Sequence, residues 1–332
     1  MTIGLLMSVS VASAGYGDAS SGYPSYDERE LHLWTNAARV DPEAFESDYQ
    51  SGGCSYYVDF SEDEQTAKQP LLWNFDLNEA GRFHSDDMLA TGNFSHDSSD
   101  GTSFSARLAR FYPSGMVGEN IAVGYGSSFS AVMNGWMCST DGHRANIMSG
   151  GWDELGTGVA SSYYTQDFGS RGVEPEYIAM GVHIPMAPTG GVELIADFFD
   201  PSEVEPESMV AMLNGVPQDM SLLYGESHRG IYGVDVVLDD TTVTCFEYYF
   251  EATVAGEPAR FPEEGSYAWG DCGYDDESAG WIRRQLVGET GGTDMTEQQL
   301  LDQFELVGCS VGGGAVGAWW VLLGLPLVRR RR

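Results

Sequence analysis

The sequence predicts an α+β protein, in which a sandwich of helices covering a sheet is followed by a small all-β sandwich. Segments with apolar residues at helical spacing come first, at residues 28–40, 76–91 and 128–137. Segments rich in β-formers and separated by Gly, Ser and Pro come next, at residues 154–161, 176–184 and 192–199. Helices followed by an antiparallel meander are typical of folds in which helices cover a sheet.

Each helix has a recognisable apolar face. The first carries Leu31, Leu33, Trp34, Ala37 and Ala38 at near-helical spacing, and Asp41-Pro42 ends it. The second is expected to begin at Asp76, with Glu79 completing a capping box. The third carries Phe129, Val132, Met133 and Trp136 on one side. All three helices can therefore bury one face against a sheet.

A second region follows Asp200-Pro201. Short strands at 230–238 and 242–254 are separated by the turn signals Asp239-Asp240 and Gly256-Glu257-Pro258. This spacing indicates a β-sandwich of the immunoglobulin or fibronectin type at residues 201–280. We expect the first domain to span residues 26–200. Fold class alone says little about function.

The N-terminus resembles an export signal. Ile3 to Ala12 is a short apolar run, and Ala12-Ser13-Ala14 offers the small residues that a signal peptidase accepts. Residues 1–14 are therefore predicted to be a signal peptide, although no Lys or Arg precedes the run, and the alternative is an apolar N-terminal tail. Residues 15–25, rich in Gly, Ser, Tyr and Pro, are interpreted as a linker.

The C-terminus is predicted to attach the protein to the cell surface. Residues 281–308 form an acidic spacer, and Val311 to Val328 is an apolar run followed by four arginines. Such a run is about 27 Å long as a helix, enough to cross a bilayer, and its positive flank stays in the cytoplasm. With Cys309 ahead of it, the segment 309–332 resembles the sorting tail of myxobacterial surface proteins. That resemblance implies cleavage near Cys309, and the alternative is a permanent membrane span.

The charge excludes one class of partner. The chain has 50 acidic and 16 basic residues, a formal net charge of −34. This charge repels phosphate backbones, so nucleic acid is not expected to bind. Solubility in a saline exterior and loose binding of divalent cations are both compatible with it.

Cysteine usage indicates an oxidising compartment. If Cys309 belongs to the tail, four cysteines remain, and four allow three pairings. We expect Cys54–Cys138 and Cys245–Cys272, which keep each bridge within one predicted domain. No cysteine pair has zinc-finger spacing.

Four motifs in order resemble the bacterial branch of the CAP superfamily of cysteine-rich secretory, antigen 5 and pathogenesis-related (SCP-like) proteins. They cover about residues 28–200 and are Leu33-Trp34-Thr35-Asn36-Ala37-Ala38-Arg39, Phe94-Ser95-His96-Asp97, Gly118-Glu119-Asn120-Ile121, and Trp136-Met137-Cys138-Ser139 with Gly142-His143-Arg144-Ala145-Asn146-Ile147. The resemblance implies an α-β-α fold with a central cleft of two His and two Glu.

The candidate cleft residues carry acid-base chemistry. His96 lies in a polar loop, Glu119 needs a partner in an apolar stretch, and His143 begins a short helix. Together these three can hold a divalent metal such as zinc or act as an acid-base pair, and they are the candidates for any catalysis. His84, Asn120 and Ser139 are further candidates for the cleft lining. For His96, His143 and Asn120 a role in bracing the loops is the alternative, and for His84 it is a solvated position on the second helix. Ser139 near His143 could also be a nucleophile, but no third orienting group accompanies it.

One departure weakens the case for hydrolysis. Where the family places its second Glu, three residues after Trp136, this chain has Ser139, and Asp141 or Glu154 are possible substitutes. Loss of a carboxylate disfavours both tight metal binding and catalysis. We therefore place binding of a small lipid-like or cell-envelope ligand, which the family resemblance implies, ahead of a hydrolase acting on peptide or envelope polymer. A purely structural surface protein is the third possibility.

Overall fold

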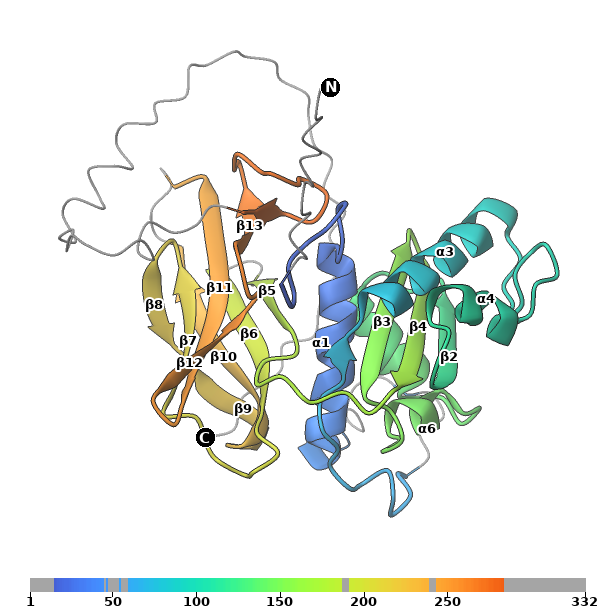
Figure 1. The fold of residues 1–332 in the computed structure, drawn as a ribbon, viewed down its shortest axis with the longest axis horizontal. Helices are drawn as coiled ribbons and strands as arrows, with labels where there is room; N and C mark the ends of the chain where they lie inside the picture. The colour runs from blue at the N-terminus through green and yellow to red at the C-terminus, as the bar shows by residue number, and fades with distance from the viewer. Residues whose placement is uncertain are drawn as a thin grey trace, which may run out of the picture. The chain divides into compact units, whose positions relative to one another are not determined.

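The computed structural model describes residues 15–283, except 45, 47–53, 55–58, 187–190 and 239–242. Three β-sheets and a set of helices make up this part of the chain (Figure 1). The predicted signal peptide, most of the acidic spacer and the tail with Cys309 lie outside the described residues. Within the described ranges, no helix is both long and apolar enough to cross a bilayer.

The first helix, α1 (Tyr26–Val40), is confirmed and starts two residues before the predicted position. Ser25 and Glu28 form the capping box that begins it. Leu31 packs into one core while Leu33 and Ala37 pack into another, so both faces of the helix are buried. The polar residues of α1 find partners inside: Asn36, for example, donates to Asp197 Oδ2 at 2.7 Å.

The first sheet has helices on both faces. Its strand order is β1 (Leu72–Trp73), β3 (Glu154–Ala160), β4 (Tyr163–Ser170) and β2 (Met116–Val123), with β1 parallel to β3 and the rest antiparallel. α1 and the π-helix η1 (Ala131–Trp136) share a core with one face. α3 (Phe75–Thr91) and α4 (Phe104–Phe111) share a core with the other. This is the predicted α-β-α arrangement.

Glycines let α3 lie directly on β3. A Cβ at Gly156 would meet the backbone of Leu77 and Asn78, and a Cβ at Gly158 would meet Gly81. The close approach fixes α3 over the strands, because no side chain separates the two backbones. Asn74 caps α3, since its side chain accepts from Leu77 N; the prediction that Asp76 is the N-cap was wrong.

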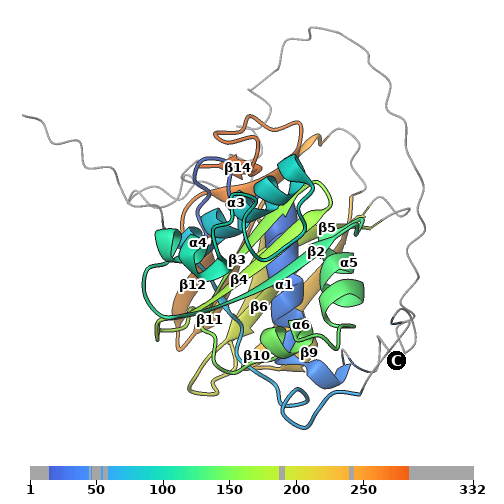
Figure 2. The ribbon, with the colours of Figure 1, turned by 90° about the vertical axis from the view of Figure 1, so that its right-hand side faces the viewer.

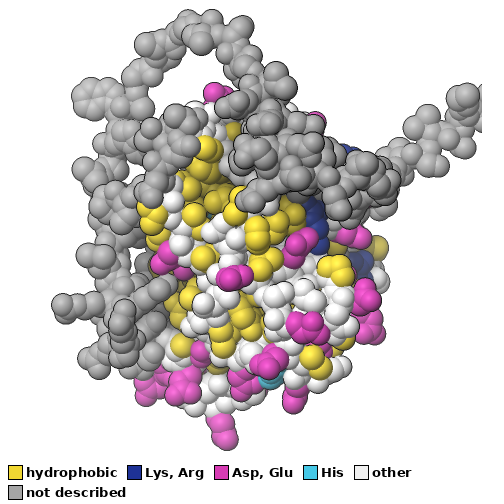
Figure 3. All heavy atoms as spheres, turned by 90° about the vertical axis from the view of Figure 1, so that its left-hand side faces the viewer, with side chains coloured by type: hydrophobic (Ala, Val, Ile, Leu, Met, Phe, Trp, Pro, Cys, Tyr) yellow, Lys and Arg dark blue, Asp and Glu magenta, His cyan; other side chains and the backbone are white. Residues whose placement is uncertain are grey.

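The second and third sheets pack on a common core. The second has the order β5 (Gly181–Met186), β6 (Gly191–Phe199), β10 (Arg229–Val237) and β9 (Ser221–Glu226). The third has β14 (Trp281–Ile282), β13 (Ser266–Gly270), β11 (Cys245–Val254), β7 (Ser208–Leu213) and β8 (Val216–Asp219), with β12 (Glu257–Phe261) on β11. Their shared core includes residues of α1. The face over β7 and β8 carries apolar and acidic side chains (Figure 3).

The pairing of strands differs from the expected meander in two ways. β6 hydrogen-bonds to β10, and β5 hydrogen-bonds to β6 rather than to the first sheet. Sheet pairing therefore runs across residue 200, where we placed a domain boundary. β2, β4 and α4 were not predicted. An immunoglobulin or fibronectin type for the second region stays a prediction.

Candidate functional site

Glu119 is at the centre of a buried polar cluster on β2. It lies opposite Asp167 in the antiparallel register of β2 and β4, and the whole residue is 6% exposed. Its Oε1 accepts a hydrogen bond from His96 Nδ1 at 2.8 Å. Its Oε2 pairs with the guanidinium of Arg107 on α4. Both carboxylate oxygens are therefore occupied, which is how an apolar stretch accommodates this charge.

His96 is oriented by this cluster. The Nη1 of Arg107 donates to the His96 carbonyl at 2.7 Å, which fixes the loop between α3 and α4. The imidazole side chain is 51% exposed. Its hydrogen bond to Glu119 raises the pKa of His96 above the ordinary value, and burial opposes that shift. With Nδ1 on Glu119, the ring presents Nε2 outward.

His84 lies behind Glu119 rather than in the pocket. Its Nε2 donates to the Ser95 carbonyl at 2.9 Å and is 3.9 Å from Glu119 Oε1. Burial lowers the pKa of His84, and the nearby Glu119 charge counteracts this. The ring is therefore a neutral brace between α3 and the loop that carries His96.

His143 approaches from the other side, at the start of α6 (His143–Ile147) as predicted. Its Nδ1 is 2.9 Å from Ser139 Oγ. Asn120 donates to the His143 carbonyl at 3.0 Å and to Gln166 Oε1 at 2.9 Å, tying α6 to the sheet. Burial lowers the pKa of His143, and the neighbouring His96 lowers it further.

The two histidines line one pocket. Its volume is about 390 Å³, and it is bordered by Phe94, Ser95, His96, Asp97, Ile121 and His143. Two of its lining residues lie on elements labelled in Figure 2: Ile121 is on β2, an edge strand of the first sheet, and His143 begins α6. The structure thus brings His96, Glu119 and His143 to one place. Asn120 and Ser139 hydrogen-bond to His143 and hold it there.

Two members of the cluster were missed from the sequence. Arg107 and Asp167 are fully buried, and neither oxygen of Asp167 has a hydrogen-bond partner in the described part of the chain. Burial raises the pKa of Asp167 well above its usual range, and the Glu119 charge raises it further. Burial and the Glu119 charge therefore both favour the protonated, neutral form of Asp167. Its place in Gln166-Asp167-Phe168 gave no signal, because the partner is found only through strand register.

The proposed substitutes for the second Glu do not take that role. Glu154 sits in a separate cluster, where Arg171 and Tyr112 bind its carboxylate. Asp141 is exposed, and its backbone N–H donates to Ser139 Oγ at 3.1 Å. Arg144 pairs with Glu64 at 3.0 Å, away from the pocket. Ser139, at the position expected for the second Glu, is therefore the residue that hydrogen-bonds to His143.

The donor set does not fit a zinc ion. A catalytic zinc site has three protein ligands. Here Glu119 would have to be the third ligand beside the two histidines, but its carboxylate oxygens already pair with Arg107 and His96. Among the described residues, no three His, Cys, Asp or Glu side chains are grouped as metal ligands. The imidazoles of His96 and His143 remain as hydrogen-bonding groups.

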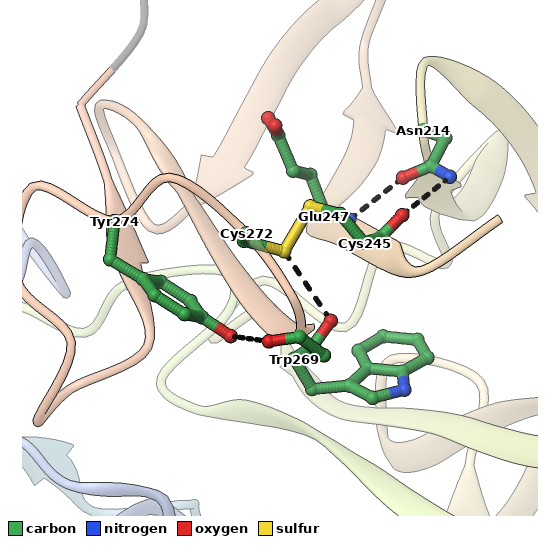
Figure 4. Close-up of a disulfide and its surroundings, with 7 residues drawn as sticks. Asn214, Cys245, Glu247, Trp269, Cys272 and Tyr274 are labelled. Atoms are coloured by element: carbon green, nitrogen blue, oxygen red, sulfur yellow. Dashed lines mark hydrogen bonds between the residues drawn. A yellow bond between two sulfur atoms is a disulfide. The ribbon is translucent and has the colours of Figure 1, made fainter. Parts of the chain in front are cut away.

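Both predicted disulfides are present. Cys54–Cys138 has a Cα–Cα distance of 5.4 Å and closes a separation of 84 residues just before Ser139. Cys245–Cys272 has a Cα–Cα distance of 4.9 Å and joins the start of β11 to the segment after β13. In its surroundings Asn214 donates to the Cys245 carbonyl and accepts from Glu247 N (Figure 4).

Comparison with known families agrees with this geometry. Residues 35–177 match the family model described as CAP: Cysteine-rich secretory protein family. This part of the chain is similar to a CAP domain. The match includes all the candidate site residues on β2, α6 and the loop after α3, and it ends before β5, so the second and third sheets lie beyond it.

Individual relatives share only part of the chain. The uncharacterized membrane protein YlbC of Bacillus subtilis is 36% identical over 102 residues, which are 30% of this chain and 29% of that protein. The chain therefore spans less than a third of the length of this curated relative. An extracellular protein with an SCP domain from Bacillus anthracis has 33% identity, a TM-score of 0.30, and coverage of 31% and 35% of the two chains. A cysteine-rich secretory protein from Staphylococcus aureus has 18% identity, a TM-score of 0.28, and coverage of 40% and 39%.

Proposed function

We propose that this chain is exported and that its CAP domain binds a small lipid-like or cell-envelope ligand in the pocket between His96 and His143. The lining of that pocket is the observation that carries the proposal. Phe94 and Ile121 supply apolar surface, and the two imidazoles supply polar groups. A volume of about 390 Å³ is in the usual range of small-molecule sites, about 300–1,000 Å³.

The polar groups favour a head group that accepts hydrogen bonds. Because Glu119 accepts a hydrogen bond from Nδ1 of His96 and raises the pKa of the ring, it favours the imidazolium form, whose Nε2–H donates to a carboxylate, phosphate or hydroxyl. His143 has a lowered pKa and is neutral at pH 7, so it adds a second polar contact without a second charge. Phe94, which is 47% exposed, can cover the apolar part of such a ligand.

Binding can be tested with the chain from residue 15 to 332 and a fluorescent long-chain fatty acid. Phe94→Ala and His96→Ala should each weaken binding about tenfold, about 1.4 kcal/mol. Phe83→Ala is the matched control, because Phe83 is equally exposed at 44% but packs on Phe111 outside the pocket. Equal affinity of all three variants and the native chain would contradict the proposal.

Hydrolysis is a second candidate, favoured by one observation. Ser139 Oγ lies 2.9 Å from His143 Nδ1, within reach for proton transfer. His96, which lines the same pocket, is paired with the carboxylate of Glu119. An activated ester and purified envelope polymer are suitable substrates. Turnover that is lost in both Ser139→Ala and His143→Ala would place hydrolysis ahead of binding.

Export and surface attachment have support from the disulfides and from the two chain ends. Two bridges are typical of oxidising compartments outside the cytoplasm. Deleting residues 309–332 should release the ectodomain into the medium. Cys309→Ala separates the two anchors, because a permanent span tolerates the change while a processed tail accumulates uncut in the membrane. Retention of the deletion variant in the cytoplasm would contradict export.

A further inference from the structure

The segment that follows the predicted signal peptide is not a linker but is packed into the protein. The Tyr16 hydroxyl donates to the Ala179 carbonyl at 2.9 Å and accepts from Trp73 N at 2.8 Å. Tyr267 donates its hydroxyl hydrogen to the Gly17 carbonyl at 2.7 Å. These contacts tie residues 15–24 to the first sheet, to the segment before β5 and to the third sheet. The backbone at Gly15 is therefore held at a defined place.

A buried carboxylate is directed at the Gly15 nitrogen. Gly15 N donates to Asp18 Oδ2 at 2.9 Å, and Glu264 N donates to Asp18 Oδ1 at 2.7 Å. Asp18 is only 1% exposed. The carboxylate of Glu263 lies alongside, accepting from Tyr16 N at 2.7 Å.

The charges around Asp18 are mostly negative. Glu263 and Glu264 flank it, and Glu176 lies near Glu263. Arg283 interacts with Asp18 only electrostatically. The guanidinium of Arg260 is directed at the carbonyls of residues 262, 263 and 265. Burial raises the pKa of Asp18, and the Glu264 charge raises it further. The site therefore lacks a directly bonded cation in the described part of the chain.

We propose that Asp18 is the binding site for the α-ammonium group of Gly15, which is created when a signal peptidase cuts after Ala14. The proposal rests on the export part of the proposed function. Hydrolysis of the Ala14–Gly15 bond consumes one water: Ala14 leaves as a carboxylate, and the Gly15 nitrogen takes up protons to become an ammonium. The leader ends in Ala12-Ser13-Ala14, the small residues that such a peptidase accepts.

Cleavage changes the strength of this contact, not its position. In the uncut chain the Gly15 nitrogen is a neutral amide donor, whereas in the cut chain it is a cation 2.9 Å from a buried carboxylate. Charge-assisted hydrogen bonds are roughly twice as strong as neutral ones. Removal of the signal peptide would therefore stabilise the fold after export, by completing an ion pair that the precursor lacks.

The test compares a chain that begins at Gly15 with one that begins at Ala14, each ending at residue 332 and released from a fusion without extra residues. At pH 7 the Gly15 chain should have an unfolding equilibrium constant about tenfold smaller, roughly a 3–5 °C higher Tm. Asp18→Asn should abolish the difference between the two chains. These measurements use purified protein, so they do not depend on ligand binding or on export.

The pH dependence supplies an independent readout. An α-amine held by Asp18 has a pKa above its ordinary value of about 7.7–8.0, which isotope-labelled dimethylation and NMR titration measure even if Asp18→Asn does not fold. Its contribution is complete below the ordinary pKa and is lost as the pH rises through the raised one. Sequencing of the exported protein should give Gly15 first. Equal stability of the two chains, an ordinary α-amine pKa, or another first residue would overturn the proposal.

Discussion

Replacing Arg107 with Met should strongly destabilise the helix-and-sheet unit that carries the candidate site. The Arg107 side chain is fully buried, pairs with the buried carboxylate of Glu119 and donates to the His96 carbonyl at 2.7 Å. Met retains most of the apolar volume but leaves the Glu119 charge with only a neutral or partly protonated His96. Removing one partner of a buried ion pair costs about 3–5 kcal/mol. For a chain of this size the expected fall in Tm is roughly 10 °C.

Urea unfolding at pH 7 measures this change. Arg110→Met is the matched control, because Arg110 is on the same helix but is exposed, and its guanidinium donates to Thr102 at 3.0 Å beside Asp100. This change should alter the stability by less than about 0.5 kcal/mol. The variant with both Arg107→Met and Glu119→Gln should recover part of the loss, since it no longer buries an unpaired charge. A loss below about 1 kcal/mol for Arg107→Met would refute the view that Glu119 depends on this guanidinium.

Three further outcomes follow from the same cluster and its surroundings. Asp167→Asn should be neutral or stabilising at pH 7, because the raised pKa of Asp167 favours its neutral form. Relative to the native protein, the stability of this variant in urea should rise as the pH increases above the ordinary Asp pKa of about 3.9. Marked destabilisation would indicate an ionised Asp167. Ser139→Ala should remove the partner of His143 Nδ1, so the NMR titration of that ring should shift while the His96 titration stays unchanged. Cys54→Ser should cost roughly 3–5 kcal/mol by freeing a loop of 84 residues, and an unchanged thermal midpoint under reducing conditions would contradict this.

The His96–Glu119 pair also sets a pH dependence with a definite sign. Because Glu119 raises the pKa of His96, the folded state holds this proton more tightly than the unfolded chain. The pair therefore stabilises fully below the ordinary His pKa of about 6.5, and the stabilisation is lost as the pH rises through the raised value. The pKa values of His84 and His143 are lowered in the folded state, so the unfolded chain binds these protons more tightly. Burial of these two rings therefore lowers the free energy of unfolding as the pH falls below the ordinary His pKa.

Local features of the sequence determined the helices that frame the site. Apolar spacing and the Asp41-Pro42 stop are readable within one segment, so α1 was predicted almost to its ends. α3 was found as well, although its cap was misplaced by two residues. The motifs around His96, Glu119 and His143 identified the residues of the pocket because each motif lies within a few positions. The pairing of four cysteines was chosen correctly on domain grounds.

Only the tertiary structure decided what those residues contact. Arg107 and Glu119 are 12 positions apart, and Asp167 meets Glu119 only through the register of β2 and β4, so neither contact leaves a local pattern. The pairing of β6 with β10 was missed for the same reason, since strand propensity does not specify a partner. Gly15 to Pro24 has the composition of a linker, yet long-range hydrogen bonds to Trp73, Ala179 and Tyr267 hold it in place. Composition reports what a segment can do by itself, while burial and register depend on residues that are distant along the chain.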